Sequence, residues 1–225
     1  MFSIMAGMDH RKKQLEMIDE IKAMGIKDKV VLEAMQTIPR HIFVPDKLRQ
    51  YAYVNDPLPI GYGQTISQPY TVAFMLEALQ LTKNMKVLEI GTGSGYNAAL
   101  LGHIVGDKGK VISVEIIKEL AEFAKKNLSR LNLQNVKVVI SDGSLGYPEE
   151  APYDRIIITA AAPSLESLPV DQLADHGIMV APVGSAMQEM YRITKKNAKL
   201  EIESLGFFRF VPLTGAKGFS NISKG

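Results

Sequence analysis

Three closely spaced glycines, Gly91, Gly93 and Gly95, constrain the fold of this chain more than any other feature. A short apolar run at 86–90 precedes them, and the residues after them predict a helix over 94–105. Glycine lets the backbone turn tightly and approach a ligand closely. The first turn of the following helix offers unpaired N–H groups at the same place. This strand–turn–helix pattern predicts a loop that holds an adenine-containing cofactor.

From residue 86 onward, apolar runs alternate with helical patterns, each crossover being long enough to join parallel strands. The further predicted strands are 110–115, 136–141, 154–160 and 177–182, and the further predicted helices are 117–131 and 169–175. We therefore expect an α/β fold with a doubly wound, mostly parallel sheet of the Rossmann-like kind. Ligands of such sheets bind beyond the carboxyl ends of the strands.

The two ends of the chain differ from this core. Apolar residues at helical spacing predict three N-terminal helices. Their inward faces are Leu15, Ile18, Ile21 and Met24, then Val31, Ala34, Met35 and Ile38 behind a cap at Asp28, then Val72, Met75, Leu76 and Leu79. Between them we expect an extended piece at 39–45 and an irregular segment at 51–69. At the other end, 189–194 and 200–205 read as a β-hairpin, with 206–212 as a candidate further strand.

The composition excludes several classes of site. The chain has 225 residues and a net charge of +2, with no basic block of the kind that marks a nucleic-acid surface. It has no cysteine, which excludes disulfides, thiolate metal sites and a cysteine nucleophile. Its four histidines lack metal-ligand spacing, so we expect no metal. No run approaches the roughly 18 apolar residues that span a bilayer. We expect a cytoplasmic protein that binds neither nucleic acid nor membrane.

Two carboxylates follow the strands next to the glycine loop. Glu115 ends the second predicted strand and can accept hydrogen bonds from both ribose hydroxyls. Asp142, beside Gly143, follows the third and can accept from an adenine amino group. A dinucleotide-binding loop needs a further glycine where this chain has Tyr96, so S-adenosylmethionine fits better than NAD. The alternative is a loop that only turns the chain, with Glu115 as a solvated strand end.

A second polar segment, 61–70, is rich in glycine and hydroxyl groups. Thr65 and Ser67 can donate hydrogen bonds, and a helix is predicted to start near Pro69, where N–H groups favour an anion. Alternatively, Ser67 only caps that helix.

At this point the chain resembles the protein-L-isoaspartate O-methyltransferase family, from about residue 10 to 214. The matching motifs are Arg40-His-Ile-Phe-Val-Pro45, Gly63-Gln-Thr-Ile-Ser67, Val87-Leu-Glu-Ile-Gly-Thr-Gly-Ser-Gly-Tyr96, Tyr153-Asp-Arg-Ile-Ile-Ile-Thr-Ala-Ala-Ala-Pro163 and Val211-Pro-Leu-Thr214. The chain departs from the pattern at Ser67-Gln-Pro-Tyr70, where many members have Ala-Pro-His after the serine. The serine is matched, but a role for a histidine there is not.

The resemblance implies a class I methyltransferase that transfers a methyl group from S-adenosyl-L-methionine to the free α-carboxylate of L-isoaspartyl residues. The product is S-adenosyl-L-homocysteine, and the ester then cyclises without the enzyme, which starts repair to aspartyl. The active-site serine falls on Ser67. The implied cofactor contacts are Gln64, Thr65, Ile66, Ser67, Gly91, Thr92, Gly93, Ser94, Gly95, Glu115, Asp142, Gly143 and Thr214.

By this resemblance, residues 1–80 form a helical extension that shapes the substrate cleft, and residues 81–225 form the cofactor-binding core with its C-terminal strands. The expected partners are proteins and peptides that contain isoaspartyl residues, and a homo-oligomer is compatible with the sequence. The alternatives are a methyltransferase of small molecules or RNA, a nicotinamide-dependent oxidoreductase, and a nucleoside-binding module without chemistry.

Overall fold

The computed structural model describes residues 2–219. Met1 of the predicted segment 1–80 and residues 220–225 of the predicted segment 81–225 lie outside the described residues. Its central strands are β3 (Lys86–Ile90), β4 (Lys110–Glu115), β5 (Val136–Ile140), β6 (Tyr153–Ile158), β7 (Leu173–Val183), β8 (Gln188–Lys196) and β9 (Lys199–Phe208). They form one sheet in the order β5-β4-β3-β6-β7-β8-β9. Strands β3 to β7 run parallel, and β8 and β9 are antiparallel additions. The predicted mostly parallel α/β fold is confirmed.

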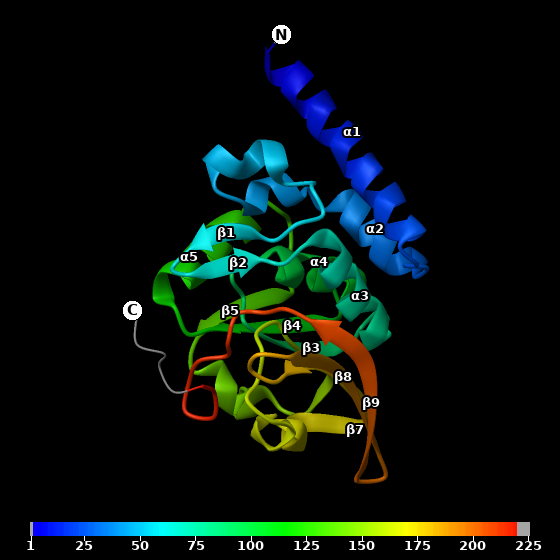
Figure 1. Cartoon of the computed structure of the whole chain (residues 1–225), viewed down its shortest axis with the longest axis vertical. Helices are drawn as coiled ribbons and strands as arrows, with labels where there is room; N and C mark the ends of the chain where they lie inside the picture. Colours follow the sequence, from blue (N-terminus) through cyan, green and yellow to red (C-terminus); the bar gives the residue numbers. More distant parts are fainter. Residues whose placement is uncertain (1, 220–225) are drawn as a thin grey trace.

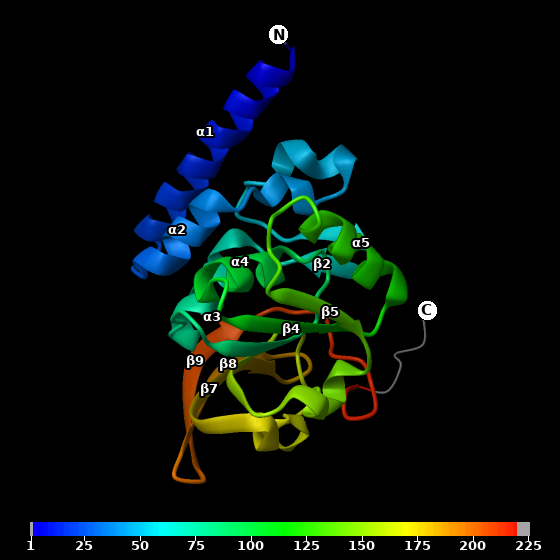
Figure 2. The same cartoon turned by 180° about the vertical axis from the view of Figure 1, so that it is seen from behind.

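The α-helices pack on one side of this sheet (Figures 1 and 2). They are α1 (Phe2–Ala23), α2 (Lys29–Thr37), α3 (Pro69–Leu79), α4 (Tyr96–Val105) and α5 (Lys118–Leu128). Helices α3, α4 and α5 contact the strands directly, whereas α2 packs on α3 and α4, and α1 packs on α2 and α3. The N-terminal helices thus extend the core that begins at the sheet.

Alternating side chains divide the core into two layers, because successive residues of a strand point to opposite faces. Val87, Val111 and Ile157 belong to the layer under the helices. Leu88 and Ile156 belong to the other layer. That layer is covered by connecting segments with short 3₁₀ turns instead of α-helices. These turns are η3 (Gly143–Leu145), η4 (Pro148–Glu150), η5 (Leu165–Ser167) and η6 (Val170–Gln172).

The helix predicted over 169–175 is therefore wrong. Residues 170–172 form only the turn η6, and β7 already begins at Leu173. Leu168 and Leu173 enter the second core layer from either side of this turn. This short turn leads the chain directly into the sheet, so no room remains for a helix.

Helix α1 buries a narrow stripe. Gln14, Met17, Ile18 and Ile21 are buried at the helical spacing i, i+3, i+4, i+7. Leu15 is 39% exposed and Met24 is 44% exposed, so their predicted inward orientation is wrong. Gln14 is buried where Leu15 was expected to be, because its side chain donates to the Met35 and Ile38 carbonyl oxygens, at 2.8 and 3.1 Å. These carbonyls lie at the end of α2 and need such a donor.

The predicted inward faces of α2 and α3 are confirmed by burial. The Asp28 cap is confirmed as well, since its side chain accepts from the Val30 N–H at 2.8 Å. The extended piece predicted at 39–45 is wrong in part, because Arg40–Phe43 form a 3₁₀ turn, η1. A second 3₁₀ turn, η2 (Asp46–Tyr51), follows this piece.

The irregular segment contains a small hairpin of β1 (Leu58–Gly61) and β2 (Gln64–Ile66). Tyr62 and Gly63 form its tip with φ of 54° and 69°, which suits a tight two-residue turn. Since α3 begins three residues after β2, the hairpin holds Ser67 between a strand and a helix start.

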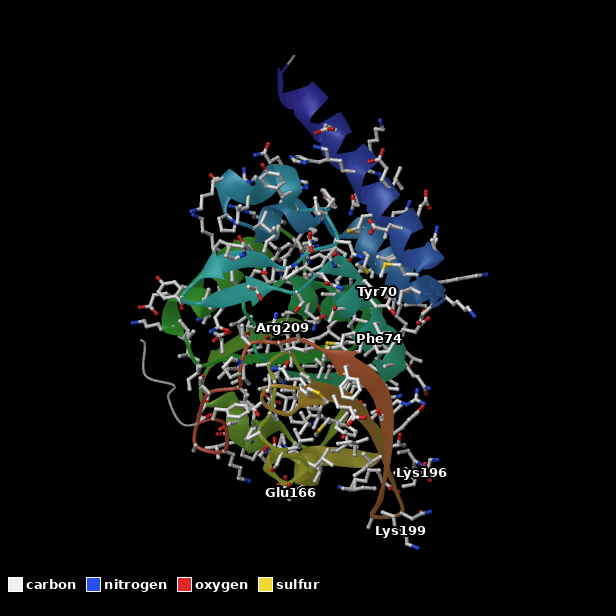
Figure 3. All side chains as sticks on the ribbon, viewed as in Figure 1. Tyr70, Phe74, Glu166, Lys196, Lys199 and Arg209 are labelled. Carbon is white, nitrogen blue, oxygen red and sulfur yellow. The ribbon has the colours of Figure 1, made fainter. Side chains whose placement is uncertain are left out.

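At the C-terminal end, β8 and β9 form the predicted hairpin around Asn197 and Ala198, whose φ values of 50° and 61° fit a two-residue turn. Lys196 and Lys199 lie at its tip, away from the β1–β2 hairpin (Figure 3). Gly206–Phe208 continue β9, so they do not form a separate strand. Beyond them, Pro212 bridges to Ala161 just past β6. This bridge brings the C-terminal segment back to the carboxyl end of the sheet.

Within the described residues, we find no helix with both the length and the apolar character needed to cross a bilayer.

Two alanine substitutions on α1 test its stripe. Ile21→Ala removes a fully buried side chain and should lower the free energy of unfolding by about 2–5 kcal/mol. Leu15→Ala, on the same helix, should change it by no more than about 0.5 kcal/mol. Urea unfolding of both variants measures the difference. Equal losses would mean that α1 packs through a different face.

Candidate functional site

A pocket that is partly open to solvent lies at the carboxyl ends of β3, β4 and β6. Its other walls come from β2 with the start of α3 and from the C-terminal segment 211–214. Most of the predicted site residues line it. They are Gln64, Thr65, Ile66, Ser67, Gly91, Thr92, Gly93, Ser94, Glu115, Gly143 and Thr214. The strand-end argument therefore pointed to the edge of the sheet at which this pocket lies.

The glycine loop is shaped by close contact with the end of β6. Gly91 has a φ of +97°, and a Cβ there would lie 2.4 Å from the Thr159 Oγ1. The Thr159 hydroxyl lies within hydrogen-bond distance of the carbonyl oxygens of Ile90, at 3.0 Å, and Gly91, at 2.7 Å. Only glycine fits this backbone and this space. Thr159 lines the pocket but was not predicted as a site residue, because the strand predicted over 154–160 included it, whereas β6 ends at Ile158.

Glu115 anchors the other side of the loop. One carboxylate oxygen accepts from the Gly93 N–H at 2.8 Å, and the other accepts from the Ile117 N–H at 3.0 Å. The residue is only 6% exposed, so the alternative of a solvated strand end is wrong. Each carboxylate oxygen can accept more than one hydrogen bond. The side chain can thus hold the loop and still accept from a ligand hydroxyl.

Beneath the loop, a buried acid joins β3, β4 and α4. The Glu89 carboxylate accepts from the Asn97 side-chain amide at 2.8 Å and from the Ser113 hydroxyl. Ser113 in turn lies 2.6 Å from the Thr92 hydroxyl. Burial raises the pKa of Glu89 to about 7, although the hydrogen bonds from Ser113 and Asn97 oppose this rise. The site therefore contains an acid that titrates near neutral pH.

The first turn of α4 adds two pocket residues that the sequence analysis did not assign. The Asn97 side-chain oxygen is buried and has no hydrogen-bond partner among the described residues, while its amide group is held by Glu89. Tyr96 is buried, and its ring packs against Phe43 at 5.4 Å between centroids. Tyr96 stands where a dinucleotide-binding loop has its third glycine, which such loops need for close helix–strand packing, so this loop departs from the dinucleotide-binding pattern.

Ser67 reaches the same pocket from the opposite wall. Gln68 occupies the N-cap position of α3, and no side chain caps the helix by a hydrogen bond, so the alternative of Ser67 as a helix cap is wrong. The Ser67 carbonyl oxygen accepts from the Arg40 guanidinium at 2.7 Å. Within the described chain no hydrogen bond engages the Ser67 hydroxyl, which leaves this group available to a ligand.

Two predicted cofactor contacts lie outside the lining. Gly95 has a φ of +87° and packs against Ala124 of α5, which explains the glycine by helix packing. The Asp142 carboxylate accepts from the Ser144 and Ala216 backbone N–H groups, at 2.9 and 2.7 Å. Burial alone would raise the pKa of Asp142, but the hydrogen bonds from Ser144 and Ala216 together lower it. Asp142 thus ties the C-terminal segment to the site, and its predicted adenine contact stays a prediction.

His41 is not part of the pocket lining. Its ring lies 2.8 Å from the Tyr53 hydroxyl and stacks on His10 at 4.2 Å between centroids, so its contacts are with the N-terminal part of the chain and not with the pocket. Residues 2–219 contain no group of three or more His, Asp or Glu side chains arranged to hold a metal.

The comparison with known families agrees with this geometry. The family model for protein-L-isoaspartate(D-aspartate) O-methyltransferase matches residues 11–218. The chain belongs to this family. A member from Archaeoglobus fulgidus is 46% identical over 96% of this chain and 99% of its own length. Another from Dictyoglomus thermophilum is 50% identical over 95% of this chain and 96% of its own length.

Solved structures of the family share the fold. One protein-L-isoaspartate O-methyltransferase superposes with a TM-score of 0.83 at 34% identity, covering 91% of this chain and 67% of that chain. A Plasmodium falciparum family member, solved in complex with S-adenosyl-L-homocysteine, has a TM-score of 0.79 at 26% identity, with 91% and 98% covered.

The buried acid predicts a pH dependence of stability. Because the pKa of Glu89 is higher in the folded state than the ordinary 4.5, the folded protein binds this proton more tightly. Its contribution to stability therefore falls as pH rises from about 4.5 to 7 and is constant above that. The stability of the wild type relative to Glu89→Gln should fall between about pH 4.5 and pH 7 and stay level above that. Urea unfolding at a series of pH values measures it.

The matched control is Glu122→Gln, on the exposed face of α5, which should show no such trend. A wild-type advantage over Glu89→Gln that stays constant across this range would contradict the prediction.

Proposed function

We infer that the chain transfers a methyl group from S-adenosyl-L-methionine to the free α-carboxylate of L-isoaspartyl residues, the reaction for which its family is named. The observation that carries this inference is the pocket itself. Ser67 with a free hydroxyl lines one wall, and the glycine loop with Glu115 lines the other. A peptide carboxylate and an adenosine can therefore be held within one cavity.

The residues present fit the cofactor. Glu115 offers acceptors for ribose hydroxyls, and the buried Asn97 oxygen without a partner offers an acceptor for an ammonium group. Apolar side chains such as Ile90, Val114 and Ile116 line the same pocket. When bound, S-adenosyl-L-methionine supplies a methyl group on a sulfonium, so that a carboxylate oxygen–carbon bond forms as the sulfur–carbon bond breaks.

This chemistry requires no general base, because an α-carboxyl group has a reference pKa of about 3.5 and is ionised at neutral pH. The task of the protein is to orient the carboxylate and to exclude water, and good orientation can lower a barrier by ~7–11 kcal/mol. The Ser67 hydroxyl orients the carboxylate by a hydrogen bond. Glu89 is occupied by Ser113 and Asn97, so it stabilises the loop and takes no part in proton transfer.

The substrate is a residue within a polypeptide, so it must enter extended. Residues 1–80 shape one wall of the cleft through the β1–β2 hairpin, and the segment 208–211 shapes the other. The expected partners are proteins and peptides with isoaspartyl residues. A cytoplasmic location and the absence of nucleic-acid binding stay predictions of the sequence.

Turnover of paired peptides tests the proposed function. An isoaspartyl peptide should accept methyl groups from labelled S-adenosyl-L-methionine, and its aspartyl twin should accept at least about 100-fold fewer, since its side-chain carboxylate is displaced from Ser67. The same assay with a small-molecule acceptor and with RNA addresses the alternative acceptors. Equal labelling of the two peptides would refute the proposed function.

The Ser67→Ala variant tests the orienting hydrogen bond. A hydrogen bond to a charged group contributes about 1.5–3 kcal/mol, so kcat/KM for the isoaspartyl peptide should fall between about 10- and 150-fold. Affinity for S-adenosyl-L-homocysteine should stay within about twofold, as measured by titration calorimetry. Ser129→Ala, at the exposed end of α5, is the control. An equal collapse of cofactor affinity would assign Ser67 to the cofactor site or to the fold.

A further inference from the structure

Arg40 is a fully buried cation directly behind the pocket wall. Its guanidinium donates to the Ala52 carbonyl oxygen and to the Ser67 carbonyl oxygen, each at 2.7 Å. It also lies over the Tyr96 ring, 5.0 Å from the centroid. Ser67 and Tyr96 both line the pocket. The Arg40 charge is thus separated from the pocket only by Ser67 and Tyr96, and the substrate carboxylate is expected beside Ser67.

No carboxylate among residues 2–219 forms a salt bridge with Arg40. The buried acid of the site, Glu89, gives its oxygens to Ser113 and Asn97 instead. One terminal nitrogen of Arg40, Nη1, has no hydrogen-bond partner in the described chain. A buried charge without a partner is costly. The protein by itself therefore leaves this charge only partly compensated.

The start of α4, against which Arg40 lies, adds to the positive electrostatic potential at this place. Tyr96 is the first residue of α4, and the N-terminus of a helix carries a partial positive charge. Burial lowers the pKa of Arg40 to about 10, so the guanidinium stays charged at neutral pH. Arg155 offers a contrast, because its guanidinium donates to the Leu79 and Gln80 carbonyls at the end of α3, where a positive charge is favoured.

We propose that Arg40 is a positioning residue that selects the ionised substrate carboxylate. Its guanidinium holds the backbone carbonyl of Ser67, and its fixed positive charge is compensated when an anion binds at Ser67. This proposal rests on the proposed function. Methylation converts the carboxylate into a neutral ester, so the same charge favours binding of the substrate over binding of the product. Arg40 touches neither substrate nor cofactor and acts through Ser67 and through its field.

A charge-coupling experiment tests the proposal. The ligands are an isoaspartyl peptide and the same peptide with its free α-carboxylate replaced by a carboxamide, each titrated in the presence of saturating S-adenosyl-L-homocysteine. The wild type should bind the carboxylate at least about tenfold more tightly than the carboxamide. Arg40→Lys, which keeps the charge, should retain most of this ratio. Arg40→Gln, which removes it, should bring the ratio to within about threefold of one.

Arg130→Gln is the control, because it removes an exposed positive charge and should leave the ratio unchanged. If Arg40 had a purely structural role, Arg40→Gln would weaken the binding of both peptides equally and leave the ratio of their affinities unchanged. This result would overturn the proposal. Thermal unfolding and S-adenosyl-L-homocysteine affinity report whether each variant is folded. If Arg40→Gln does not fold, Arg40→Met is used in its place, because methionine keeps an apolar stem and introduces no unpaired polar group.

Binding to the wild type is a test in its own right. Equal affinity for the carboxylate and carboxamide peptides would overturn the role of Arg40 without any variant. Failure of the proposed function is a different result: the wild type would then leave the isoaspartyl peptide unmethylated. Methylation without charge coupling would retain the function and remove only the inference about Arg40.

Discussion

The site depends on one tight turn, in which the backbone between β3 and α4 passes through glycines at positive φ. Thr159, the residue after β6, contacts this turn from one side and Glu115, the last residue of β4, from the other, so three strand ends are held in one place. A side chain at Gly91 would collide with Thr159. The pocket is therefore a consequence of how three parallel strands terminate together, and the other walls are built against it.

Two buried ionisable side chains flank the turn. Glu89 lies beneath it, with a pKa raised by burial, and Arg40 lies behind the Ser67 wall with carbonyl oxygens as its partners. Neither arrangement favours stability, because buried charges lose their hydration. Proteins keep such groups mainly at functional sites. Around this pocket they hold the loop, the start of α4 and the β2–α3 junction in fixed positions, which is what an orientation-based reaction needs.

Much of the fold could be predicted from the sequence. Apolar runs located β3 to β7, and periodicity located α2 and α3, since these elements bury whole faces. The helix at 169–175 was wrong because the chain already pairs with β6 at Leu173, so only a short turn fits before the strand. Leu15 was placed inward because a pattern of apolar residues cannot show that Gln14 satisfies the end of α2. Such errors occur where a tertiary hydrogen bond or a sheet register decides the outcome.

For the site, the sequence by itself determined which residue types stand at the strand ends: the glycine loop, Glu115 and the segment ending at Ser67. Chain connectivity and residue type suffice for this, because parallel strands end at a common edge. Only the tertiary structure decided that Arg40, Asn97 and Thr159 belong to the same place, and that Asp142 binds the C-terminal segment. These relations join residues far apart in the chain. They depend on three-dimensional packing, which leaves no periodic signal in the sequence.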